Sequence, residues 1–149
     1  MMLEFIIFGS LVLLAYWFFT DKANRLDIYL AAIISFCWVF FSGLYGYRGS
    51  DYVVMGLNVF AFVAWTAGLV LVNKIYVYLF KEKYWMFVIF YIVVMVAIEF
   101  VGYNMWGIQL ATHYAGIAGI EAMHMPWWWQ LYYLTAGILF VKLSEAMKK

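Results

Sequence analysis

Glu99 is the residue whose type and position most clearly allow chemistry. It is the only Asp, Glu, Lys or Arg in the apolar stretch 84–107. An ionisable side chain inside a membrane span costs at least about 2.5 kcal/mol on insertion scales, so such a residue usually has a function. A carboxyl group can donate or accept a proton during catalysis. We therefore expect Glu99 to be the catalytic acid or base if the chain is an enzyme, and a carboxylate held by hydrogen bonds if it is not.

Aromatic residues near Glu99 would form the walls of a ligand pocket. Tyr103 and Trp106 follow Glu99 at spacings that keep side chains on one helical face. Aromatic faces stabilise positive charge, which would suit carbocation chemistry on an isoprenoid. The Trp-rich turn at 126–129 could join this pocket, or its indole rings could anchor a helix at the membrane surface. The predicted ligand pocket consists of Tyr103, Asn104, Trp106, Trp127 and Trp128.

His113, Glu121 and His124 are the candidates for a metal site. Glu and His three residues apart can reach one metal ion from the same helix. Met123 and Met125 flank His124, and thioether sulfur suits a soft ion such as Cu(I). If 109–124 were helical, the three candidate ligands would lie within an arc of about 80°. The ion would be copper or zinc, and a polar cluster without metal is the alternative interpretation.

The composition indicates that a lipid bilayer surrounds most of the chain. Hydrophobic residues make up 69% and charged residues 11% of the 149 residues, whereas a soluble domain is about 25% charged. Too few charged side chains remain to cover an apolar core with a polar surface. The net charge of +1 gives no support for nucleic-acid binding. We expect an integral membrane protein in direct contact with the lipid bilayer.

Hydropathy divides the chain into five apolar segments separated by short polar ones. A helix needs about 20 apolar residues to cross hydrocarbon about 30 Å thick, with about 17–25 tolerated. No linker, repeat or low-complexity tract separates the segments, so they belong to a single transmembrane domain. The predicted fold is an all-α polytopic bundle of five transmembrane helices, over residues 3–20, 28–47, 52–72, 84–107 and 127–143.

The stretch 108–126 fits neither a loop nor a span. It is too apolar for an ordinary loop, and Gly107, Gly116 and Gly119 interrupt it. Its alanines recur at a spacing that lets helix backbones approach closely. We expect a re-entrant or interfacial helix on the external side. A sixth span is the alternative, and it would move the C-terminal lysines to the other side of the membrane.

Few other polar features are informative. Asn58 and Thr66, in the third predicted span, are expected to form hydrogen bonds between helices. The chain contains no G-x-S-x-G, P-loop, Cys-x-x-Cys or His-Glu-x-x-His motif. No sequence pattern therefore identifies a reaction or a cofactor.

The sequence favours a non-catalytic subunit of a larger membrane assembly. Five short spans leave almost no mass outside the membrane, so helix surfaces would make the contacts with other membrane subunits. The first alternative is a membrane-embedded enzyme or binding protein for a lipid-like or isoprenoid ligand, with Glu99 as acid or base. The second alternative is external binding of copper or zinc by His113, Glu121 and His124.

The positions of Lys and Arg predict an external N-terminus and a cytoplasmic C-terminus. Short loops rich in these residues remain in the cytoplasm. Arg48 is the only basic residue left outside, so it is also the only external cation that could pair with Glu99. The basic residues predicted inside are Lys22, Arg25, Lys74, Lys81, Lys83, Lys142, Lys148 and Lys149.

Cysteine accessibility tests this orientation. Cys37 is the only cysteine, so a Cys37→Ser background leaves a cysteine added after Lys149 as the single target. We expect a membrane-impermeant maleimide to label that cysteine only after the membrane is permeabilised. Labelling in intact cells would show the opposite orientation, and a cysteine added before Met1 is the reciprocal control.

Overall fold

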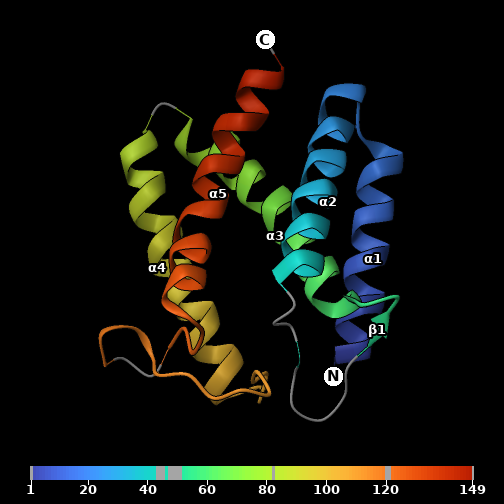
Figure 1. Cartoon of the computed structure of the whole chain (residues 1–149). Coiled ribbons are helices and arrows are strands. Elements are labelled where there is room, and N and C mark those ends of the chain that lie inside the picture. The colour runs from blue at the N-terminus through green and yellow to red at the C-terminus, as the bar shows by residue number, and fades with distance from the viewer. Residues whose placement is uncertain (1, 43–45, 47–51, 82, 120–121, 149) are drawn as a thin grey trace.

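The structure, a computed structural model, is a bundle of five long helices. It describes residues 2–42, 46, 52–81, 83–119 and 122–148. The predicted all-α helical bundle is confirmed. The long helices in chain order are α1 (Met2–Phe19), α2 (Lys22–Ser42), α3 (Val59–Ile75), α4 (Tyr84–Asn104) and α5 (Trp127–Met147) (Figure 1).

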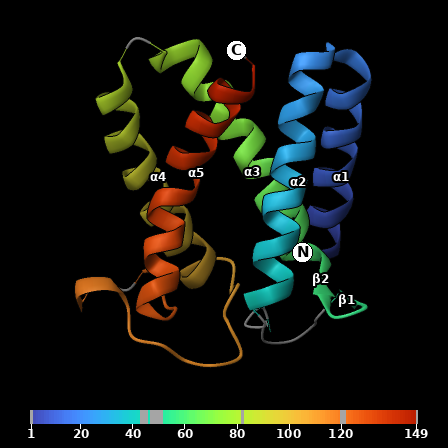
Figure 2. The ribbon, with the colours of Figure 1, turned by 45° about the horizontal axis from the view of Figure 1, so that its top comes forward.

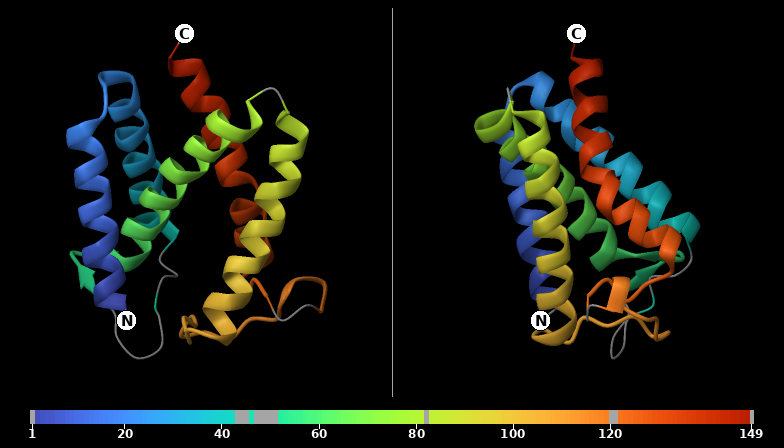
Figure 3. Two further views of the ribbon diagram at one scale, coloured as in Figure 1. Left: turned by 180° about the vertical axis from the view of Figure 1, so that it is seen from behind. Right: turned by 90° about the vertical axis from the view of Figure 1, so that its left-hand side faces the viewer.

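Helix α3 joins the two halves of the bundle. In Figure 2, α1 and α2 lie side by side, as do α4 and α5. Seen from behind, α3 runs obliquely from α1 and α2 at one end toward α4 at the other (Figure 3). It contacts α1, α2 and α5, and its side chains Trp65 and Leu69 are buried in the core. Contacts with α3 therefore hold the outer helices in one body.

Four of the helices are long and apolar enough to cross a membrane. They are α1, α2, α4, and α3 together with the π-helical turn Tyr76–Phe80 that extends it. Helix α5 has 21 residues but is not in this set, because polar residues such as Gln130, Lys142 and Glu145, together with its Trp and Tyr residues, lower its hydropathy. No residue of α1 is buried within the chain. An apolar helix with this exposure is suited to a lipid environment, which indicates an integral membrane protein.

The two termini lie at opposite ends of the bundle (Figure 1). The α1–α2 connection, the α3–α4 connection and the C-terminal end of α5 share one end, which we call the basic end. Its described basic residues include Lys22, Arg25, Lys74, Lys81, Lys83 and Lys148. The other end carries the N-terminus and the segment between α4 and α5.

Helix α2 begins before the predicted span 28–47. A carboxylate oxygen of Asp21 accepts a hydrogen bond from the backbone nitrogen of Asn24 at 2.8 Å, an interaction that favours a helix start. The helix therefore runs from Lys22 to Ser42. Asp27, which was predicted to lie in a polar connection, is therefore part of α2, and only 1% of its surface is exposed.

Helix α3 begins after the predicted start of the third span at residue 52. Strands β1 (Val53–Val54) and β2 (Leu57–Asn58) form a short antiparallel hairpin there. Met55 and Gly56, in the turn, have φ values of 50° and 84°. Two consecutive positive φ values are typical of the tight turn whose twist matches a hairpin. Residues 52–58 are therefore not part of the third helix.

Asn58 determines where α3 begins. Its side-chain oxygen accepts a hydrogen bond from the backbone nitrogen of Ala61 at 3.0 Å, in the N-cap position. Thr66 donates to the carbonyl of Phe62 at 2.8 Å, so this hydrogen bond lies within α3 and does not join two helices as predicted. Both of these hydrogen bonds therefore lie within α3 or at its first turn.

The helix expected within 108–126 is not formed in the described part of that stretch. Helix α4 ends at Asn104, and the chain continues irregularly with one 3-10 turn, Ile117–Gly119. Positive φ values at Gly107, Ala118 and Met123 interrupt any regular helix. The segment nevertheless stays at one end of the bundle, as expected for a segment that does not cross (Figure 1).

Tyr91 of α4 inserts its side chain into the backbone of α5. Its hydroxyl donates to the carbonyl of Tyr133 at 2.7 Å and accepts from the backbone nitrogen of Gly137 at 3.0 Å. An uninterrupted α-helix would join those two backbone groups to each other. The close approach requires glycine, because a Cβ at position 137 would lie 2.3 Å from Cε2 of Tyr91. Tyr91 and Gly137 thus fix how α4 packs on α5.

Substitution of Gly137 tests this packing. Gly137→Ala should lower the free energy of unfolding by about 1–3 kcal/mol, because the added methyl group must displace the Tyr91 ring. Gly68→Ala is the matched control, since a Cβ there has open space. Urea unfolding in detergent measures both variants, and equal stability of the two would contradict the packing described.

Candidate functional site

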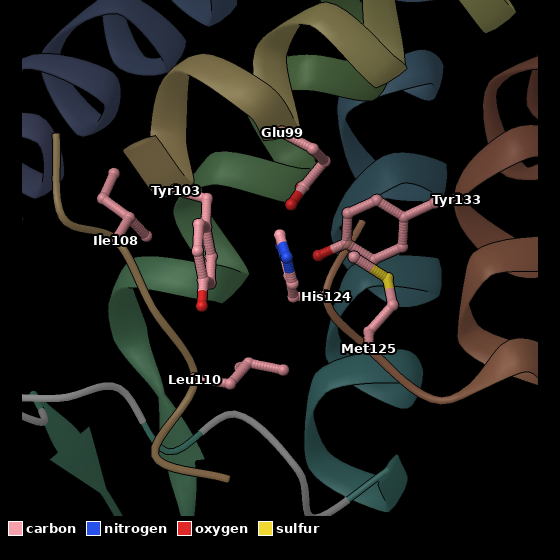
Figure 4. Close-up of a pocket in the computed structure, with 7 residues that line it drawn as sticks. All are labelled: Glu99, Tyr103, Ile108, Leu110, His124, Met125 and Tyr133. Atoms are coloured by element: carbon pink, nitrogen blue, oxygen red, sulfur yellow. The ribbon is translucent and has the colours of Figure 1, made fainter. Parts of the chain in front are cut away.

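A small cavity opens at the end of the bundle that faces away from the basic end. Its volume is about 50 Å³. Helix α4, helix α5 and the irregular segment between them all contribute side chains to it. The residues that line it are Glu99, Tyr103, Ile108, Leu110, His124, Met125 and Tyr133 (Figure 4).

Glu99 and His124 point toward each other across this cavity. In Figure 4 the carboxyl group of Glu99 extends toward the imidazole ring of His124, and the hydroxyl of Tyr133 points to the same ring from the side opposite Tyr103. Glu99 is half-buried, whereas His124 and Tyr133 are buried. Three side chains that can transfer protons therefore converge on one point from α4, the irregular segment and α5.

The ring of His124 is stacked on Tyr103. Their ring centroids are 3.7 Å apart and the ring planes differ by 17°. The hydroxyl of Tyr103 in turn lies 3.5 Å from Nδ1 of His113. Tyr103, one turn after Glu99 on α4, thus orients His124 and connects it to His113.

Gln130 holds the short segment that carries His124. Its side-chain nitrogen donates to the carbonyl oxygens of Met123 and Met125, each at 3.1 Å. Met123 has a φ of 57°, a conformation that turns the chain sharply. Ala122, Met123, His124 and Met125 are all buried as a result. Irregular backbone inside an apolar bundle is tolerated where side chains satisfy its polar groups, as Gln130 does.

The structure places two of the three predicted metal ligands near each other. The rings of His113 and His124 have centroids 6.1 Å apart. Glu121 lies outside the described residues, so the complete set has no geometry here. Within the described part of the chain, no three His, Cys, Asp or Glu side chains are grouped as a metal ion would require. The metal site stays a hypothesis.

The predicted ligand pocket is only partly brought together. Tyr103 lines the cavity with Glu99, but Asn104, Trp106, Trp127 and Trp128 do not. The ring of Trp106 lies 5.7 Å from that of Phe5 on α1, and Trp128 lies 6.1 Å from Trp38 on α2. Trp127 is 72% exposed, as an interfacial anchor would be. The side chain of Asn104 donates to the backbone carbonyl of Phe100.

Sequence reasoning did not select four of the lining residues: Ile108, Leu110, Met125 and Tyr133. Tyr133 lies on the buried stripe of α5 with Trp129, Gly137 and Phe140, and this spacing was a usable signal. Ile108 and Leu110 belong to irregular chain, where no periodicity predicts which side chains turn inward.

The cavity combines a carboxyl group, an imidazole and two phenols with the apolar side chains of Ile108, Leu110 and Met125. None of the described side chains that line it belongs to Lys or Arg. Arg48, the external cation proposed as a partner of Glu99, lies outside the described residues. The described groups can exchange protons with one another and form hydrogen bonds to a small polar group.

Comparisons with protein-family models, with curated proteins and with solved structures found no match to this chain. The geometry of the cavity and the side chains that line it are therefore the observations that bear on function.

Substitution of Tyr103 tests the arrangement around His124. Tyr103→Leu should lower the free energy of unfolding by about 1 kcal/mol beyond the loss from burial, because stacking on the imidazole is lost. Tyr103→Phe retains the ring and should stay close to the native protein. Urea unfolding in detergent provides the values, and equal losses in the two variants would show that the stacked ring contributes nothing.

Proposed function

We propose that the chain binds the polar end of a lipid-like ligand, such as an isoprenoid, and that Glu99 and His124 act on it as an acid–base pair. The observation that carries this proposal is the convergence of Glu99, His124 and Tyr133 on one cavity. Polar groups in a membrane bundle are costly and rare, so three of them around one small space support a role in binding or catalysis.

The size of the cavity limits the part of the ligand that it can hold. A water molecule occupies roughly 10–15 Å³ by the same measure, so a cavity of about 50 Å³ admits only a few non-hydrogen atoms. A hydroxyl, carbonyl or similar terminal group fits this space. The apolar remainder of the ligand would lie along exposed side chains such as Ile98 and Phe100 of α4, in contact with lipid.

The lining supplies the complementary chemistry. A carboxyl group can donate a hydrogen bond to a ligand oxygen, and a neutral imidazole can accept a proton from the same group. Tyr103 and Tyr133 add ring faces, which favour a neighbouring positive charge. Leu110 and Met125 add apolar side chains to the lining, and an electrostatic interaction is stronger beside apolar groups than in water.

A subunit of a larger assembly is the second candidate. The observation in its favour is α1, an 18-residue helix with no buried residue, which packs on α2 and α3 and leaves its outer surface open. Another membrane protein could cover that surface, and lipid could cover it equally. Purification in mild detergent distinguishes these cases, because a subunit would bring a fixed stoichiometry of partner proteins.

Glu99→Gln tests the proposed function. The amide keeps the size of the side chain but cannot transfer a proton, and it changes the hydrogen bonds offered to a ligand. With geranylgeraniol as a probe, thermal-shift titration in nanodiscs should give an affinity at least about tenfold weaker for the variant. The lipids extracted from the two purified proteins should differ in the same sense.

Glu145→Gln is the control for this experiment, since Glu145 is a carboxylate at the basic end that pairs with exposed Lys142. It should bind the probe as the native protein does. Equal affinities of the native protein and Glu99→Gln would remove Glu99 from the site. Copurifying partner proteins together with no bound lipid would favour the assembly subunit instead.

A further inference from the structure

A second buried polar cluster lies at the basic end, between α2, α3 and α5. Asp27, Asn73 and Ser144 are 1%, 1% and 2% exposed. Ser144 donates to Oδ1 of Asp27 at 2.6 Å, and Nδ2 of Asn73 donates to Oδ2 at 2.9 Å. The same nitrogen of Asn73 lies 3.1 Å from Oγ of Ser144. Each of the three helices thus provides one member of the cluster.

Lys148 completes this cluster with a positive charge. Its Nζ lies 2.6 Å from Oδ2 of Asp27, and its side chain remains 27% exposed. A buried carboxylate without a cation or several donors is strongly unfavourable, and here both oxygens of Asp27 are occupied. The cluster is therefore a receptor for an ammonium group, and the terminal turn of α5 supplies the ammonium.

Neighbouring charges have other partners. Lys74, beside Asn73 in sequence, directs its ammonium to the side-chain oxygen of Asn24 and over the ring of Tyr16. Exposed Lys142, on α5 itself, pairs with Glu145 at 3.2 Å and lies over the ring of Tyr84. Among the described residues, Lys148 is therefore the cation that pairs with Asp27.

The cluster and the candidate site share helix α5. Ser144 and Lys148 stand four residues apart and so occupy one face of its last turns. Tyr133, which lines the cavity, is eleven residues before Ser144, about 16 Å along a helix that rises 1.5 Å per residue. Helix α5 is also less apolar than the four helices that are long and apolar enough to cross a membrane.

We infer that Asp27 and Lys148 are positioning residues: their ion pair anchors the C-terminal end of α5 and thereby holds Tyr133 and Met125 over Glu99. This inference goes beyond the proposed function and rests on it only in treating the cavity as the functional site. Tyr91 holds the middle of α5 and the ion pair holds its C-terminal end. Loss of the pair removes one of these attachments, so it should loosen the packing of α5 on α4 and open the cavity.

Two measurements in nanodiscs test the inference without any ligand. Hydrogen–deuterium exchange of residues 140–148 reports whether the end of α5 is held. The rate at which dicyclohexylcarbodiimide modifies Glu99, followed by peptide mass spectrometry, reports whether the cavity is covered. The native cavity of about 50 Å³ excludes this bulky apolar reagent, so modification should be slow.

Lys148→Gln removes the cation and should raise both exchange at the end of α5 and the rate of Glu99 modification, the latter by roughly tenfold. Asp27→Asn should act in the same direction. Lys148→Arg keeps the charge and should resemble the native protein. Lys142→Gln is the control for loss of charge, because it removes a cation of the same helix that pairs with Glu145 and lies over Tyr84 but does not contact Asp27.

Each outcome of this comparison bears on the inference. Faster exchange at the end of α5 with unchanged Glu99 modification would show that the pair stabilises the helix end without positioning the site. No change in either measurement would show that Lys148 is not an anchor. The test relies on Lys148→Gln, because Asp27→Asn could prevent folding. If the native protein failed to bind lipid, that result would contradict the proposed function but not the role of this ion pair.

Discussion

The constraint on which the structure depends is that a polar group inside an apolar bundle must find its partners within the protein. Water is absent from the hydrocarbon region, and an unsatisfied buried group costs free energy comparable to a lost hydrogen bond. Helix α5 meets this constraint at three levels. It gives Ser144 to Asp27 at the basic end, a backbone carbonyl and amide to Tyr91 in the middle, and Gln130 to the segment around His124.

These three attachments explain how a helix with Gln130 and Lys142 can be part of a membrane bundle. Gln130 bonds to the segment before α5, Ser144 bonds to Asp27 on α2, and Lys142 lies exposed at the basic end. The attachments also explain why the irregular segment before α5 is buried. Met123 and His124 are buried although their backbone is not helical, and Gln130 satisfies the carbonyls of Met123 and Met125.

The candidate site lies where the bundle is least regular. Glu99 comes from a straight apolar helix, whereas His124 comes from a segment with a positive φ at the preceding residue. Strained backbone and buried polar side chains often occur together at functional sites, because the surrounding packing maintains both. The stacking of Tyr103 on His124 is one such packing interaction, and it links the regular and irregular parts of the site.

The sequence by itself determined the apolar helices and singled out Glu99 as the ionisable residue within one of them. Both follow from composition and from the helix length that the hydrocarbon of a membrane requires. Glu99 stood out for this reason, as did the segment between α4 and α5. Only the tertiary structure decided that His124 and Tyr133 meet Glu99, that Trp106 and Trp127 do not, and that Asp27 is buried. Those facts depend on how helices far apart in the sequence cross and on where caps and positive φ values end them, and no local pattern of residues specifies either.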